Sequence, residues 1–80
     1  MIDYSNIKNS YITALHVGLM LNAGYEDAKR GNELLHKFCE SCVENSNYSD
    51  KEKQRMKYDL SIVKNTLSQE IEQRFHNTCQ

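Results

Sequence analysis

Histidine and cysteine residues at short, repeated spacings are the residues of this sequence that could carry out chemistry. In the stretch LLHKFCESC, His36, Cys39 and Cys42 stand three apart, and His76 and Cys79 repeat that spacing near the end of the chain. A zinc site would need about four converging nitrogen or sulfur ligands, and a redox pair would need a stabilised thiolate. The positions of these side chains on the predicted helices indicate whether they can form a reactive site or only pack in the core.

A long helix is predicted over residues 50–77. Ser49 and Glu52 form the S-x-x-E pattern of a capping box at its start. Behind them, apolar residues recur at three- and four-residue steps, which is the period of a single helical stripe. This stripe consists of Met56, Leu60, Val63, Leu67, Ile71 and Phe75. The preceding polar stretch ENSNYS predicts a short loop that joins two antiparallel helices.

The same periodicity predicts two further helices, over about residues 4–23 and 26–44. The second has a stripe of Ala28, Gly31, Leu35, Phe38 and Cys42. Asn22, Gly24 and the acidic pair that follows favour a break, with Gly24 ending the first helix. A break gives a three-helix bundle, and a continuous helix gives a long antiparallel hairpin. Either way the predicted fold is all-α, in a single domain over residues 1–80 that holds three glycines and no proline.

Helix geometry argues against both kinds of chemistry. His36 and Cys39 can share one helix face, but in a hairpin His76 would lie ~25 Å further along, too far to complete a site within one chain. Cys39 and Cys42 stand late in their helix, at the wrong end of the dipole for a thiolate. We therefore expect no metal and no cofactor, with Cys42, and also Cys39, packed as small apolar residues. His16 is expected to lie at the surface or to have its hydrogen bonds satisfied within the chain.

Composition excludes several functional classes. The net charge of −1, from ten basic and eleven acidic residues, provides no basic face for nucleic acid. No apolar run approaches the about 20 residues of a membrane span, and the first residues lack a signal-peptide pattern. Three cysteines, an odd number, argue against a disulfide framework. We expect a cytoplasmic protein that is not an enzyme, because its carboxylates are scattered and it has no phosphate-binding glycine loop.

Apolar residues exceed what one stripe per helix can bury. Ile12, Val17 and Met20 lie off the main stripe of the first helix, and Ile62 lies beside Val63. A third helix, a second copy of the chain or another protein could cover them. Five tyrosines suit either an interface or the edge of a bundle. These features predict a protein-binding module, with a homo-oligomer as one possibility.

The order ITALHVGLMLNAGYEDAK, a polar middle and then LSQEIEQRFHNT resembles the small helical-hairpin co-chaperones of bacterial type III secretion needle subunits. The resemblance covers most of the chain. It implies a complex with a larger helical-repeat chaperone that keeps an aggregation-prone needle subunit soluble. The residues that would contact the partner are Leu15, Leu19, Val63, Leu67, Ile71 and Phe75. The alternatives are a phage- or plasmid-encoded inhibitor that blocks a host protein, and a homodimeric regulator that contacts DNA.

Overall fold

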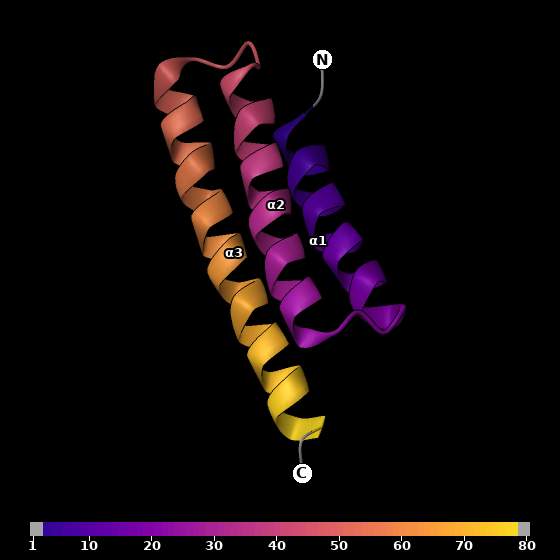
Figure 1. Ribbon diagram of the computed structural model, residues 1–80. Helices are drawn as coiled ribbons and strands as arrows, with labels where there is room; N and C mark the ends of the chain where they lie inside the picture. The colour runs from indigo at the N-terminus through magenta and orange to yellow at the C-terminus, as the bar shows by residue number, and fades with distance from the viewer. Residues whose placement is uncertain (1–2, 79–80) are drawn as a thin grey trace.

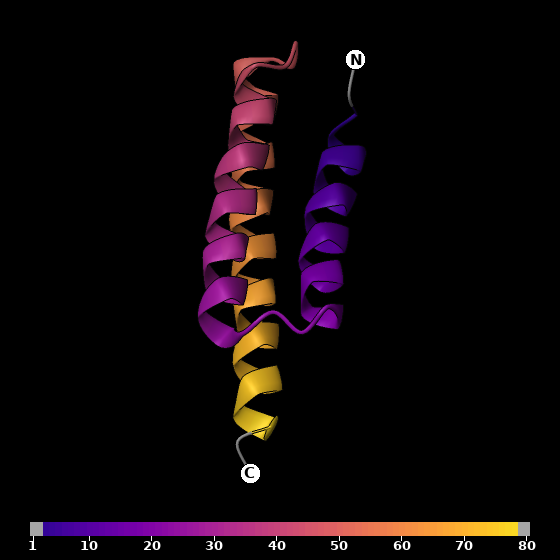
Figure 2. The ribbon, with the colours of Figure 1, turned by 45° about the vertical axis from the view of Figure 1, so that its right-hand side comes forward.

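The computed structural model describes residues 3–78, which form three α-helices: α1 (Tyr4–Met20), α2 (Tyr25–Glu44) and α3 (Asp50–Thr78). Successive helices run in opposite directions, so α1 and α3 are parallel to each other and antiparallel to α2 (Figure 1). The largest contact joins α2 to α3, which overlap in the view of Figure 2, and α1 packs mainly on α2, beside which it lies in Figure 1. The all-α prediction is confirmed as a three-helix bundle, and the two-helix hairpin is excluded.

The break between α1 and α2 is present, but Asn22 makes it instead of Gly24. Among the described residues, Asn22 is the only non-glycine residue with a positive φ, at 67°. Its N–H donates to the Leu19 carbonyl at 3.0 Å, and the Ala23 N–H donates to the Gly18 carbonyl at 3.1 Å. These two bonds are the Schellman motif, in which asparagine can replace glycine. α1 therefore ends three residues earlier than predicted, and Gly24 stands in extended backbone as the N-cap of α2.

The capping box at the start of α3 is confirmed. The Ser49 hydroxyl accepts the Glu52 N–H at 3.2 Å, and a Glu52 carboxylate oxygen accepts the Ser49 N–H at 3.3 Å. Two backbone donors that the helix itself leaves unpaired are therefore satisfied. This local arrangement fixes where α3 begins, and with it the length of the loop from α2.

The start of α1 is capped by a distant residue. Asp3 occupies the N-cap position, but its carboxylate accepts the Ser5 hydroxyl at 2.7 Å and makes no cap bond. The Tyr4 N–H instead donates to the hydroxyl of Tyr48, at 3.0 Å, from the loop before α3. The Tyr4 hydroxyl donates to Asp59 of α3 at 2.6 Å. These contacts attach the first turn of α1 to the α2–α3 hairpin.

The core forms where the three apolar stripes meet. On α3 the predicted stripe is confirmed, with its central residues Leu60, Val63, Leu67 and Ile71 buried. On α2 the predicted face is only partly correct: Ala28 is buried and Leu35 and Cys42 are half-buried against the core, but Asn32 is buried and Phe38 is 67% exposed. No other helix approaches Gly31 of this stripe closely, since a methyl group at that position would contact no atom of another helix within 4 Å. The observed face of α2 is rotated because this helix packs against both of the others.

The bundle is elongated, with dimensions of 47 × 19 × 16 Å. The C-terminal part of α3 extends past the turn that joins α1 to α2 (Figure 1). Within residues 3–78, no helix combines the length and the apolar character that a membrane crossing requires.

Candidate functional site

The two neighbouring cysteines are reduced and occupy different environments. Cys39 is buried at 4% exposure, and its thiol lies 3.9 Å from the Ile7 carbonyl, to which it donates. Burial raises the pKa of the Cys39 thiol to about 11, so it is protonated at neutral pH. Cys42 is half-buried. Both cysteines pack against the core as expected, Cys39 more deeply than Cys42, and the protonated Cys39 thiol is a poor nucleophile.

The histidines lie apart from one another. His36 is half-buried, with Nδ1 3.7 Å from a Glu40 carboxylate oxygen and Nε2 buried without a hydrogen-bond partner. His16 is exposed, as expected, and pairs with Glu70 of α3 at 2.9 Å. His76 is exposed, and Cys79 lies outside the described residues. Within the part of the chain that the structure describes, no three His, Cys, Asp or Glu side chains come together around a potential metal position.

The residues that the resemblance implies as partner contacts lie inside the bundle. Leu15, Leu19, Val63, Leu67 and Ile71 are at most 7% exposed, and Phe75 is half-buried. Phe75 also packs edge-on against Tyr25, with ring centroids 5.6 Å apart. These side chains are covered by the chain's own helices. Their contact with a partner stays a prediction that would require the bundle to open.

A buried polar network links all three helices at mid-height. Tyr11 of α1 donates its hydroxyl hydrogen to the side-chain oxygen of Asn32 on α2, and both residues are 1% exposed. The Asn32 amide donates to the Ser68 hydroxyl at 3.0 Å and to the Lys64 carbonyl at 3.1 Å, both on α3. The sequence reasoning missed Asn32. The sequence did contain a signal for it: Asn32 lies four residues after Ala28, on a second possible stripe of α2 with the same helical period.

Most of the surplus apolar residues remain exposed. Ile12 is half-buried, whereas Val17 is 46% exposed, Met20 76% and Ile62 47%. The third helix therefore covers only part of the surplus. Leu21, Leu34, Phe38 and Tyr58 are further large apolar side chains that face solvent.

An apolar groove runs between α1 and α2, and we call it the α1/α2 groove. Its wider part has a volume of about 200 Å³ and is lined by Asn6, Ile7, Ser10, Tyr11, Leu35, Phe38, Cys39 and Cys42. Its narrower part, about 100 Å³, continues along the same helices past Ala14, Gly18 and Gly31, and is also lined by the exposed Asp27 of α2. Leu35 lines both parts, so the two hollows adjoin at this residue. No charged residue lines the wider part.

The side of α1 next to this groove has no charged residue. Lys8 is the only Asp, Glu, Lys or Arg within α1. Lys8 and His16 both face α3, where they pair with Asp59 at 3.2 Å and with Glu70 at 2.9 Å. We call the uncharged surface beside the groove the neutral face. It consists of Asn6, Ser10, Ala14 and Val17 on α1 with Leu34 and Phe38 on α2, all exposed.

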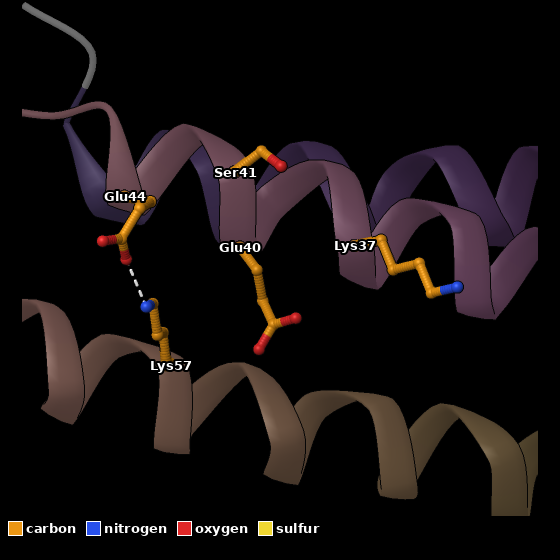
Figure 3. Close-up of a pocket in the computed structure, with 5 residues that line it drawn as sticks. All are labelled: Lys37, Glu40, Ser41, Glu44 and Lys57. Carbon is orange, nitrogen blue, oxygen red and sulfur yellow. Dashed lines mark ion pairs between the residues drawn. The ribbon is translucent and has the colours of Figure 1, made fainter.

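Two other depressions are more polar. The groove between α1 and α3, about 260 Å³, is lined by Lys8, Asp59 and Glu70 as well as by apolar side chains. A larger open hollow of about 440 Å³ lies between α2 and α3 (Figure 3). There the Lys57 ammonium bonds to the Glu44 carboxylate, which lowers the pKa of Glu44 and raises that of Lys57.

This charged hollow contains no catalytic arrangement. Lys37, Glu40 and Ser41 complete its lining, and Lys37 points along the helix, away from the Glu44–Lys57 pair (Figure 3). Lys57 and Glu44 offset each other's charge, and both are substantially solvated. The lining therefore has the character of a solvated seam between two helices, and the α1/α2 groove is the better candidate site.

Comparisons with known proteins found no match: no family model matches the chain, and no match was found among curated proteins or solved structures.

Proposed function

We propose that this chain is a protein-binding module that docks another helical surface on its neutral face. The observation that carries the proposal is the exposure of Phe38, Leu34 and Val17 beside an apolar groove that has no charged lining in its wider part. Contiguous exposed apolar surface on a small protein is typical of an interaction site. An aromatic side chain at the edge of a groove is also the usual anchor of such an interface.

The arrangement of the tyrosines directs the proposal to this face. The hydroxyls of Tyr4, Tyr11, Tyr25 and Tyr48 bond to residues of their own chain, so these side chains hold the bundle together. On α3, Tyr58 is 70% exposed, whereas Phe75 is half-buried against Tyr25, so Tyr58 has no second exposed aromatic residue beside it on the described part of this helix. The neutral face instead combines an aromatic with several aliphatic side chains, which together can exclude water from a contact.

A narrower form of the proposal is the co-chaperone of a secretion-needle subunit. The support for it is the resemblance in length and helix order. In this form the partner would occupy the neutral face first, and Leu67 and Ile71 would become accessible only if α1 moved away. An inhibitor that blocks a host protein would use the same face, with no opening of the bundle.

Site-specific photo-crosslinking tests the proposal. A photoreactive phenylalanine analogue is placed at position 38 in one variant and at position 58 in a matched control, and both are expressed in the organism that encodes the chain. Both positions are about equally exposed and aromatic, at 67% and 70%. We expect a discrete protein adduct from position 38 and none from position 58. Absence of an adduct at position 38, or equal adducts at both positions, would refute the proposal.

A further inference from the structure

We propose that the occupant of the neutral face is a second copy of this chain, so that the protein forms a symmetric dimer through α1 and α2. This inference rests on the proposed function, because it names the partner of the same face. A two-fold dimer pairs one patch with itself, and each contact occurs twice. The patch must therefore match its own charge and its own shape.

Charge favours a self-pairing. A partner that placed a charged side chain on the neutral face would bury that charge without a counter-charge, which is strongly unfavourable. The partner surface must therefore be uncharged as well. In the described chain, the outer sides of α2 and α3 carry many acidic and basic residues, whereas α1 carries only Lys8, which is bound to α3. The neutral face is the surface of this chain that meets the requirement.

The shape of the face supplies both parts of a contact. Phe38 projects from one rim of the groove, and the wider part of the groove beside it, about 200 Å³, is lined by apolar and uncharged polar side chains. A side chain from a second copy can therefore enter a depression on the first. The two-fold symmetry then repeats this contact with the two copies exchanged. Ridges entering grooves are how helix faces pack in general.

The available area is sufficient for a weak but specific dimer. The 17 residues of α1 span about 25 Å, and a two-helix face is roughly 20 Å wide. Two copies would therefore bury on the order of 1,000 Å² in total, which is near the lower bound for specific interfaces. We accordingly expect a dimer whose dissociation constant is micromolar, so that concentration decides the oligomeric state.

Sedimentation velocity from low to high micromolar concentration tests this inference on the full chain. We expect a concentration-dependent shift from monomer to dimer for the unmodified chain and for the control Tyr58→Glu. Phe38→Glu should raise the dissociation constant at least about thirty-fold, the loss typical of a hot-spot residue. Leu34→Glu serves as a second variant, and circular dichroism of each variant verifies that the helices are retained.

The possible outcomes separate the two proposals. A chain that stays monomeric throughout, or a dimer that Phe38→Glu and Leu34→Glu leave intact, would overturn the dimer. If the position 38 crosslink then joins the chain to a different protein, the proposed function stands and only the second copy is wrong. A crosslinked product of twice the chain's mass, lost in Leu34→Glu, supports both.

Discussion

The Tyr11 hydroxyl on α1 donates to the side-chain oxygen of Asn32 on α2 in the middle of the core, where each residue is 1% exposed. The Asn32 amide is in turn bonded to α3 through Ser68 and the Lys64 carbonyl. A polar group in a core is stable only when its hydrogen bonds are made, and here one residue satisfies them across all three helices. This network therefore restricts the relative register of α1, α2 and α3.

Removal of the Tyr11 hydroxyl should weaken the fold. Tyr11→Phe leaves the Asn32 oxygen without its partner in the core, which we expect to lower the free energy of unfolding by about 1–3 kcal/mol. Urea denaturation monitored by circular dichroism measures the change. Tyr25→Phe is the matched control, because its hydroxyl bonds to the exposed Glu72 and its loss should cost less. An equal effect of both substitutions would contradict a special role for the buried network.

A charge at Leu67 should unfold the bundle. Leu67 is 3% exposed among apolar side chains of all three helices, so Leu67→Asp buries an unpaired carboxylate. We expect loss of the cooperative thermal transition and of most helical circular dichroism, whereas Asn65→Asp, at an exposed site of the same helix, should retain both. A folded Leu67→Asp variant that fails to bind its partner would instead identify Leu67 as a contact residue.

Stability should depend on acid through Asp59. Bonds from the Tyr4 hydroxyl and then the Lys8 ammonium hold the pKa of Asp59 below its ordinary value. A lowered folded-state pKa contributes stability that is fully present above about pH 4 and is lost as the pH falls through the folded value. Asp59→Asn should therefore destabilise the chain at pH 7 and have a smaller effect near pH 2. Urea denaturation midpoints of the unmodified chain and of Asp59→Asn, measured at pH 7 and near pH 2, give the effect of the substitution at each pH. An equal effect at both pH values would contradict the linkage.

The two neighbouring thiols should react at different rates. Cys39 is buried and its pKa is raised to about 11, whereas Cys42 is half-buried at the α1/α2 groove. At pH 8 we expect iodoacetamide to alkylate Cys42 well before Cys39, as followed by peptide mass spectrometry, because the thiolate is the reactive form. In urea the two rates should become similar. Equal rates in the folded chain would show that Cys39 is accessible.

Features with local causes could be predicted from the sequence. The capping box of Ser49 and Glu52 and the apolar period from Leu60 to Ile71 predicted α3 correctly, because each depends on residues within one or two turns. The end of α1 was misplaced because both Asn22 and Gly24 can adopt the conformation that stops a helix. The hydrogen bonds made by Asn22 and Ala23 select between them.

The position of the candidate site could not be predicted from residues that are close together in the sequence. On α2, steps of three and four fit a stripe through Gly31 and Phe38 as well as one through Asn32 and Cys39, because both match 3.6 residues per turn. The sequence itself determined that the chain is helical and carries more apolar residues than one stripe per helix needs. Only the packing of α2 against both α1 and α3 placed Asn32 in the core and Phe38 in solvent, which creates the neutral face.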